Sequence, residues 1–423
     1  MAVDVTKYTT ILPLGQVPLL VVRLGWTDVP LTTTVTEWSD LIFGNQRKQL
    51  NEYELRNTHG SMSFKPVIES EGVANDGIIT INMNYTHPQY TDINGSQKSD
   101  VELRKGEALA IVDNYVDFAQ YDLNGDNTLS SAELTIIFVL AGQEQAMTAD
   151  KAHNGSVWGR WMSGFMPFYT QDAVKLLDIV VKAGDITIGE LHGTQIATVG
   201  IVAHELHHAL YNSIDIYDLD NTTRGIGNFG MMSGGAHGFD VTRGDRAGDS
   251  PALANAYTQI KAGLVVPQEI NASTNGLVSI PANLTTYNVI KINTSRPNEY
   301  FLVENYVAVA ERGNPIISGW DNLNSGLLVL RVNENKTDNT DETNRMVEVI
   351  EADGNTNIDY KDAFHNTMPD VATTLFYEGN AVVMSPNSLT ASSNFADGTS
   401  SGITLDGVSR NADGSISFNV TYQ

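Results

Sequence analysis

The residues best suited to chemistry lie in the segment His204-Glu205-Leu206-His207-His208, which has the pattern H-E-x-x-H. On an α-helix, side chains four positions apart lie on one face, so His204 and His208 are expected to offer imidazole nitrogens to a single metal ion. A zinc ion with three protein ligands and one open position lowers the pKa of its bound water to roughly 7. A carboxylate beside that water accepts a proton and passes it to a leaving amine. The pattern therefore predicts peptide-bond hydrolysis, with Glu205 as the base.

The flanking residues predict that this segment is helical. Apolar residues recur at the spacing of one buried helical face: Ile196, Val199, Ala203, Leu206 and Leu210. The two histidines lie beside this stripe, at the edge of the core, where a cleft can open. His207 also lies near that face and is an alternative to His208, although the i, i+4 geometry favours His208.

A third ligand is expected in the acidic, turn-rich segment 215–220, which is followed by the glycine-rich segment 225–235. Together these segments resemble the zinc metallopeptidases of the immune inhibitor A type. That family carries H-E-x-x-H-x-x-G-x-x-D-x-Y-D and then a glycine-rich approach to L-M-S-G-G. The resemblance implies that His204 and His208 are zinc ligands and Glu205 is the base. It also implies that Asp215 is the third ligand and that Met232 lies in a tight turn beneath the metal.

The sequence departs from the family pattern directly after the second histidine. Tyr211 stands where the family has glycine, and Asp215 comes one residue late. Asn212 tolerates the left-handed backbone conformation and is expected to supply the turn instead. Asp218 is the alternative third ligand.

A second motif, in residues 122–133, predicts a calcium site. It matches the EF-hand loop at positions 1, 3, 5, 9 and 12. The expected ligands are Asp122, Asn124, Asp126, the backbone carbonyl of Thr128, and Glu133 as the bidentate carboxylate. Asn127 stands where the EF-hand has glycine, and asparagine accepts the left-handed turn. The competing interpretation is a solvated acidic turn. A strand is expected after the loop in place of a second helix, so a bound calcium ion would be structural.

Composition limits the possible partners and compartments. The chain has 423 residues, 25 Lys and Arg against 50 Asp and Glu, a formal net charge of −25, and no cysteine. Such a surface repels nucleic acid and anionic membranes, which argues against both as partners. No disulfide or thiolate metal site can form. No apolar run approaches the roughly 20 residues that a membrane helix needs. The family resemblance implies a secreted, extracellular protein.

The distribution of elements predicts an α+β protein with two domains. Residues 1–267 are expected to form a zinc-metallopeptidase catalytic domain, with a mixed sheet and the active-site helix. Helices are predicted at 38–50, 101–121 and 251–267, and strands at 17–24, 62–68, 77–83, 134–140 and 185–191. Residues 268–423 contain short strands separated by turn residues, which is typical of an all-β, sandwich-like domain. The family resemblance extends from about Val17 to the end of the chain.

The leading hypothesis is therefore a secreted zinc endopeptidase acting on proteins or peptides. His237, five residues after Met232, is the candidate donor to the oxyanion of the tetrahedral intermediate. By the resemblance, the strand at 185–191 is expected to pair with an extended substrate. The alternative is a calcium-dependent binding or adhesion protein with an inactive metallopeptidase-like domain, which the intact His204, Glu205 and His208 argue against.

Overall fold

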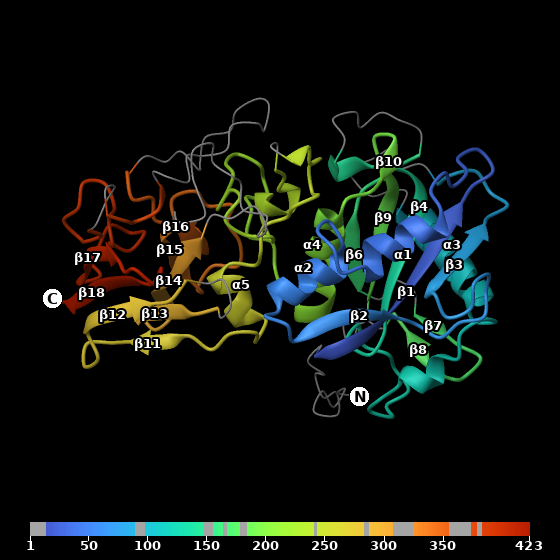
Figure 1. Ribbon diagram of the computed structural model, residues 1–423, viewed down its shortest axis with the longest axis horizontal. Helices are drawn as coiled ribbons and strands as arrows, with labels where there is room; N and C mark the ends of the chain where they lie inside the picture. Colours follow the sequence, from blue (N-terminus) through green and yellow to red (C-terminus); the bar gives the residue numbers. More distant parts are fainter. Residues whose placement is uncertain are drawn as a thin grey trace. The chain divides into compact units, whose positions relative to one another are not determined.

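The computed structural model describes residues 14–88, 98–147, 155–163, 167–177, 184–240, 243–282, 287–307, 325–354, 374–378 and 383–423 (Figure 1). Contacts between Cα atoms divide the chain into two compact units. Unit 1 comprises residues 1–212 and 247–249, and unit 2 comprises residues 213–246 and 250–423. Within the described ranges, no helix is long and apolar enough to cross a membrane.

Unit 1 is built on one mixed, eight-stranded sheet. The central path runs β10-β9-β4-β1-β2, while β3 pairs with β1, β5 with β4, and β6 with β9. Six of these strands run parallel to their neighbours, and β6 and β10 run antiparallel to β9. The strands are β1 Gly15–Gly25, β2 Met62–Pro66, β3 Ile78–Asn82, β4 Thr135–Glu144, β5 Ser156–Val157, β6 Arg160–Ser163, β9 Gly184–His192 and β10 Gln195–Ile196. A separate two-stranded sheet contains β7 Phe168–Tyr169 and β8 Lys175–Leu176. The mixed sheet predicted from the sequence is confirmed.

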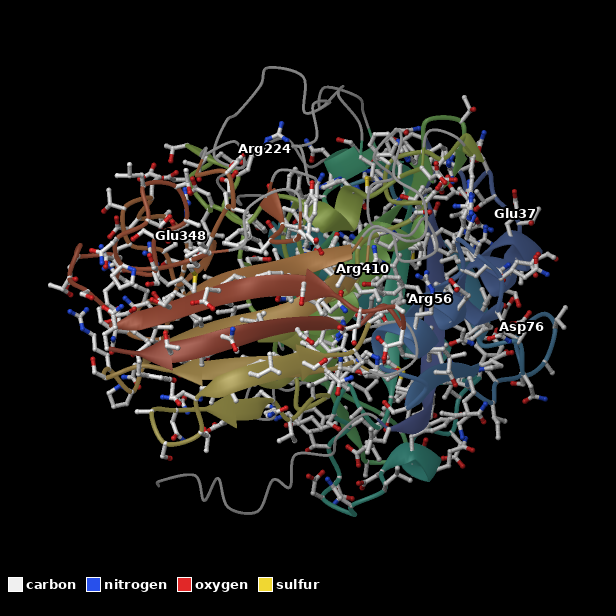
Figure 2. All side chains as sticks on the ribbon, turned by 60° about the vertical axis from the view of Figure 1, so that its left-hand side comes forward. Glu37, Arg56, Asp76, Arg224, Glu348 and Arg410 are labelled. Carbon is white, nitrogen blue, oxygen red and sulfur yellow. The ribbon has the colours of Figure 1, made fainter. Side chains whose placement is uncertain are left out.

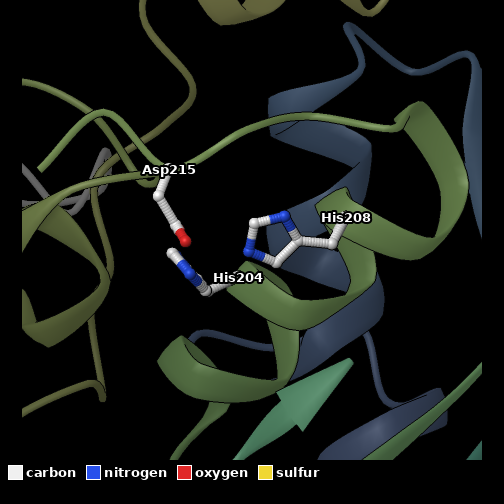
Figure 3. A group of neighbouring side chains, drawn as sticks. All are labelled: His204, His208 and Asp215. Carbon is white, nitrogen blue, oxygen red and sulfur yellow. The ribbon is translucent and has the colours of Figure 1, made fainter. Parts of the chain in front are cut away.

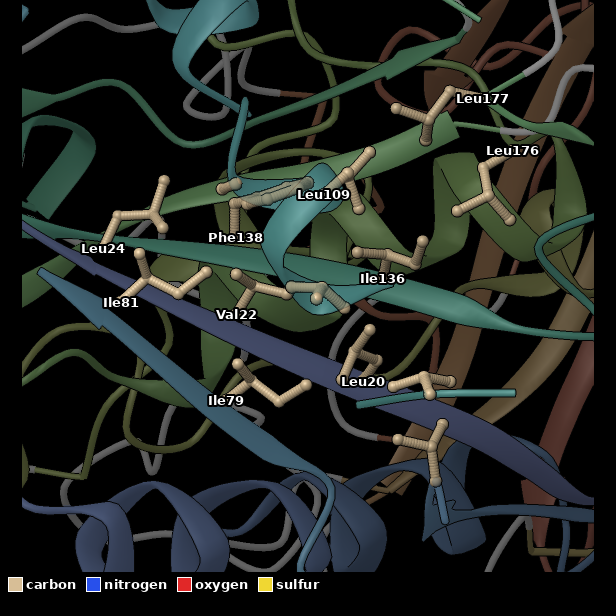
Figure 4. Packing of buried hydrophobic residues seen from close by; sticks show 14 of the residues in the cluster. Leu20, Val22, Leu24, Ile79, Ile81, Leu109, Ile136, Phe138, Leu176 and Leu177 are labelled. Carbon is tan, nitrogen blue, oxygen red and sulfur yellow. The ribbon is translucent and has the colours of Figure 1, made fainter. Parts of the chain in front are cut away.

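The central strands β1 and β4 are apolar on both faces, as expected for parallel strands covered on both sides. On one face, alternate residues of β1, β3 and β4 pack with helix α3 (Lys98–Val112) in a single core. Figure 4 shows part of this cluster, including Leu20, Val22, Leu24, Ile79, Ile81, Leu109, Ile136 and Phe138. Because β4 lies in the middle of this core, the backbone at its carboxyl end is held in place, and side chains there have defined positions.

Two of the predicted helices of unit 1 are shorter than expected. The helix predicted at 38–50 is instead two helices, α1 (Val35–Phe43) and α2 (Leu50–Asn57), separated at Gly44. Thr34 and Glu37 form a capping box that starts α1; Glu37 is labelled in Figure 2. The helix predicted at 101–121 ends at Val112 and is followed by a separate 3₁₀ turn, η2 (Phe118–Tyr121). The side-chain amide of Asn114 donates to the carbonyls of the last turn of α3, which competes with helix continuation.

Unit 2 contains two β-sheets around one hydrophobic core. The five-stranded sheet has the order β11-β13-β14-β15-β16, and the three-stranded sheet has the order β12-β18-β17. The strands are β11 Gln268–Ile270, β12 Gly276–Ile280, β13 Val289–Asn293, β14 Glu299–Val307, β15 Ser325–Asn333, β16 Val347–Val349, β17 Ile403–Arg410 and β18 Ile416–Tyr422. Both sheets contribute to the same core; for example, Phe301 and Val329 belong to the larger sheet and Leu405 and Phe418 to the smaller one. Two sheets that share one core form a sandwich, as predicted.

Outside the sandwich, unit 2 includes one α-helix and one 3₁₀ helix in its described part. The helix predicted at 251–267 is only α5 (Ala256–Lys261), because the Asn255 side chain accepts the N–H of Thr258 and starts the helix there. The 3₁₀ helix η4 spans Gly234–His237. With several sheets and few helices, the described part of the chain is consistent with the predicted α+β class.

Candidate metal centre

The H-E-x-x-H segment lies on α4 (Val199–Tyr211), a helix of unit 1. The prediction that Ile196 opens this helix is wrong, because Ile196 belongs to β10 and pairs with Leu191. Asn212 ends the helix with φ 51° and ψ 33°, and its N–H donates to the carbonyls of His207 and His208. The predicted left-handed turn at Asn212 is therefore confirmed, and it directs the chain away from the helix just before Asp215.

The three predicted zinc ligands come together. One ligand atom each from His204, His208 and Asp215 lies within 4.8 Å of the others (Figure 3). The two imidazole rings meet edge to face, with centroids 4.9 Å apart. His204 is buried, and the other two side chains are half-buried. Two imidazole nitrogens and one carboxylate are a donor set that zinc accepts, and three protein ligands leave a fourth position for water or substrate. The residues therefore fit a catalytic zinc ion.

His207 is not a member of this group and contacts a different helix. Its Nε2 lies 2.5 Å from Nδ2 of Asn57 on α2, and both side chains are fully buried. Because an amide nitrogen only donates, the imidazole accepts at Nε2. Burial, with smaller effects from His204 and His208, lowers the pKa of His207 to about 3, so the ring is neutral. His207 is a packed side chain of the α2–α4 interface, which favours His208 as the ligand.

Asp218, the alternative third ligand, belongs to a different acidic group. Its carboxylate accepts hydrogen bonds from the N–H and hydroxyl of Thr223 and from the hydroxyl of Thr222. Although burial opposes the charge, these bonds hold the pKa of Asp218 below its ordinary value. Asp218 lies within 4.8 Å of Asp220 and Glu342, all in unit 2. The arrangement favours Asp215 in the histidine group.

The carboxylate of Glu205 is positioned by a backbone amide. The N–H of Trp161, on β6, donates to Glu205 Oε2 at 2.6 Å. The Trp161 ring stacks beside the His208 imidazole, with centroids 6.3 Å apart and planes at 24°. Glu205 is only 8% exposed. The predicted base is thus a largely buried carboxylate with one oxygen occupied by a defined donor.

Met232 and His237, the other residues that the sequence nominates, lie in unit 2. Met232 is fully buried, and its carbonyl accepts the N–H of Ile216, the residue after Asp215. This hydrogen bond fixes the backbone beside Asp215, the predicted third ligand. His237 ends η4 with its side chain exposed, and it is not a member of either metal-binding group found among the described residues.

In the candidate calcium loop, the carboxylates accept hydrogen bonds from backbone N–H groups of the loop itself. Asp122 accepts N–H groups from Gly125, Asp126 and Asn127, and Glu133 accepts those of Leu123 and Ser130. The remaining predicted ligands are Asn124, which accepts the N–H of Asp126; Asp126, which accepts the N–H of Thr128; and Thr128, which bridges to Lys175. Asn127 has φ 59°, as predicted. Two groups of three acidic or histidine side chains in the described part of the chain are close enough to share a metal ion, and neither includes a residue of the loop 122–133. Calcium binding therefore stays a prediction.

The strand expected to pair with substrate is covered along most of its length. β9 pairs on one side with β4. On the other side, Gly184–Thr187 pair with β6, and Leu191–His192 pair with β10. Between these two pairings, the carbonyl of Glu190 also accepts the N–H of Ala197 at 2.9 Å. The prediction of substrate pairing along 185–191 is wrong, because antiparallel strands that are close in sequence already occupy that edge.

Comparisons with known proteins assign no family to the chain. No family model matches it, and no curated protein has a significant sequence match. Among solved structures, wild-type OgpA from Akkermansia muciniphila is 13% identical, with 79% of this chain and 94% of that chain covered and a TM-score of 0.29. Catalytically inactive OgpA in complex with an O-glycopeptide (glycodrosocin) substrate is 14% identical, covering 78% and 93%, also with a TM-score of 0.29. Similarity at this level supports no conclusion about the chain.

Proposed function

We propose that the chain is a zinc-dependent endopeptidase of proteins or peptides, similar to the immune inhibitor A type. The observation that supports this most is the convergence of His204, His208 and Asp215 within 4.8 Å, with Glu205 on the same helix. The three side chains would hold zinc. When bound, zinc lowers the pKa of a water molecule and polarises a carbonyl oxygen.

The role of Glu205 follows from its position and its hydrogen bond. One carboxylate oxygen, Oε2, accepts the Trp161 N–H, which leaves Oε1 to take a proton from the attacking water. Because the side chain is largely buried, little solvent competes for that proton. The protonated carboxyl then donates to the amine nitrogen of the leaving peptide. Oxyanion stabilisation by His237, structural calcium in the loop 122–133 and secretion are further parts of the proposal, based on the sequence.

The test is hydrolysis of casein by the purified protein, with and without a zinc chelator, and after zinc is restored. Glu205→Gln should keep zinc and the fold while losing activity on the order of 10²-fold or more, because an amide cannot accept the proton. Glu52→Gln, on α2, is the control and should retain the parental rate. Parental activity in Glu205→Gln, or full activity after chelation, would refute the proposal.

A further inference from the structure

The backbone that contacts Glu205 belongs to a short corner, residues 158–161, which joins β5 to β6 and includes the first two residues of β6. Trp161 supplies the N–H that Glu205 accepts. Two residues earlier, Gly159 lies directly against α4: a Cβ added there would be 2.4 Å from Cγ2 of Ile201. Ile201 precedes Glu205 by one helical turn. The corner therefore packs on the same part of α4 that carries the base, and only glycine allows so close an approach.

A buried glutamate at the end of β4 holds this corner in place. Glu144 is 1% exposed, and its carboxylate accepts three backbone N–H groups. Oε1 accepts from Ala146 at 3.1 Å and from Gly159 at 3.0 Å, while Oε2 accepts from Gly189 of β9 at 2.8 Å. Burial raises the pKa of Glu144 to about 7, opposed by these three bonds, and Glu205 adds a smaller increase. One side chain thus joins β4, β9 and the corner.

The start of β6 is held independently by a buried ion network. Arg160 donates to Oε1 of Glu102 on α3 at 2.7 Å. Nζ of Lys105 lies 2.6 Å from both Oε2 of Glu102 and Oδ1 of Asp185 on β9. The network has two positive and two negative charges, so it is balanced, and removal of any member leaves a buried charge without its partner. Trp161 follows Arg160 directly, so the chain that leads into it is held at Gly159 by Glu144 and at Arg160 by the ion network.

We propose that Glu144 is a positioning residue for the general base. It holds the backbone of residues 159–161 so that the Trp161 N–H engages Oε2 of Glu205 and orients Oε1 as the proton acceptor. The inference rests on the proposed peptidase function, but the hydrogen bond that it concerns exists without substrate. A misplaced corner leaves the Glu205 carboxylate free to rotate, which lowers the rate of proton transfer while leaving substrate affinity unchanged.

The experiment compares Glu144→Gln with Glu190→Gln. Glu190 is a matched control, because it is also fully buried on the same sheet and also accepts three hydrogen bonds, from the N–H groups of Thr32 and Thr33 and the Thr33 hydroxyl. The first measurement is hydrogen exchange at the Trp161 amide in the zinc-free protein. We expect exchange at least about tenfold faster in Glu144→Gln, since glutamine replaces one acceptor oxygen by an NH₂ group that faces a backbone N–H and cannot accept it. Parental exchange is expected in Glu190→Gln.

The second measurement is peptide hydrolysis by the zinc-loaded proteins. Glu144→Gln should lower kcat by about tenfold or more and change KM by less than about twofold, because the lost interaction acts on the base and not on substrate binding. Parental exchange at Trp161 in a folded Glu144→Gln variant would overturn the proposal, and so would faster exchange with a parental kcat. A parent protein without peptidase activity would refute the proposed function, while amide exchange would still decide whether Glu144 places Trp161.

If Glu144→Gln does not fold, Gly159→Ala provides the second variant. The added Cβ pushes the corner away from Ile201 and leaves the Glu144 carboxylate in the chain. The same two changes, faster Trp161 exchange and a lower kcat, are expected. Gly159→Ala with parental values of both would overturn the proposal.

Discussion

The buried carboxyl of Glu54 should make unit 1 less stable as pH rises, and Glu54→Gln should remove this effect. Glu54 lies on α2 and is completely buried. Burial raises its pKa from 4.5 to about 8, and the nearby Asn57 amide opposes the shift only in part. Burial, and then the charge of Glu54, also raises the pKa of Tyr211 on α4. The folded protein therefore keeps the Glu54 proton over a range of pH in which the unfolded chain has lost it.

The size of the effect follows from the shift. Between pH 4.5 and about 8 the folded state binds one more proton than the unfolded state, so the free energy of unfolding falls as pH rises. Each pH unit in this range corresponds to about 1.4 kcal/mol, which gives roughly 3 kcal/mol at pH 7 and roughly 4 kcal/mol at pH 8, where the folded-state carboxyl is itself half ionised. Glutamine has nearly the same shape and no proton to lose. Glu54→Gln should thus match the parent within about 1 kcal/mol at pH 5 and exceed it by a few kcal/mol at pH 8.

Urea unfolding of the zinc-free protein, followed by tryptophan fluorescence, tests this prediction. Four of the five tryptophans lie in unit 1, so the signal reports mainly on that unit. Glu52→Gln is the control: Glu52 lies on the same helix but is half-buried and paired with Arg56 at 2.6 Å. The free energy of unfolding of Glu52→Gln should differ from that of the parent by the same amount at both pH values. An equal difference at pH 5 and pH 8 for Glu54→Gln would show that Glu54 does not hold a proton in the folded state.

Three further predictions concern the metals. His208→Ala should lose both zinc and activity, whereas His207→Ala should keep zinc and lose stability; metal analysis and thermal melts distinguish them, and the opposite pattern would exchange the two roles. Asp215→Ala should weaken zinc binding, measured by competition with a chelator, more than Asp218→Ala does, and a reversal would make Asp218 the ligand. A calcium-selective chelator should lower the melting temperature while zinc stays bound, since a ligand at a hundred times its dissociation constant stabilises the folded state by about 2.7 kcal/mol. Glu133→Ala should reproduce most of that loss, and a parent that melts identically with and without calcium would leave the loop as an acidic turn.

The features predicted correctly from the sequence are mostly local ones. The 3.6-residue spacing defines the face of α4 that carries His204 and His208, and Asn212 supplies the turn that ends the helix. The strands of the sandwich follow short alternating runs between turn residues. The predicted ends of the helices are less accurate. An apolar pattern continues past Val112, but the side chain of Asn114 competes for the last carbonyls of α3. Such a competition depends on side-chain geometry that hydrophobic spacing does not contain.

The surroundings of Glu205, the proposed base, could not be predicted because they depend on contacts between distant segments. Glu144 follows a long apolar run and belongs to no motif, yet it accepts N–H groups from residues 15 and 45 positions further along the chain. β6 reaches Glu205 only because it folds back antiparallel onto β9. The group of Trp161 that contacts Glu205 is its backbone N–H, which every residue except proline has. Residue type therefore gave no signal for it.

The choice between Asp215 and Asp218 shows the same limit for the third ligand. Both are acidic, both follow the second histidine closely, and spacing alone does not separate them. The structure fixes the backbone between them at Ile216: its N–H donates to the Met232 carbonyl at 2.9 Å, and its carbonyl accepts from the Asn339 side chain at 2.7 Å. Asn339 is fully buried and also exchanges two hydrogen bonds with Val347 of the sandwich sheet. Within unit 2, the backbone next to Asp215 is thus held by a buried side chain 123 residues further along, which is itself bonded to the β-sandwich.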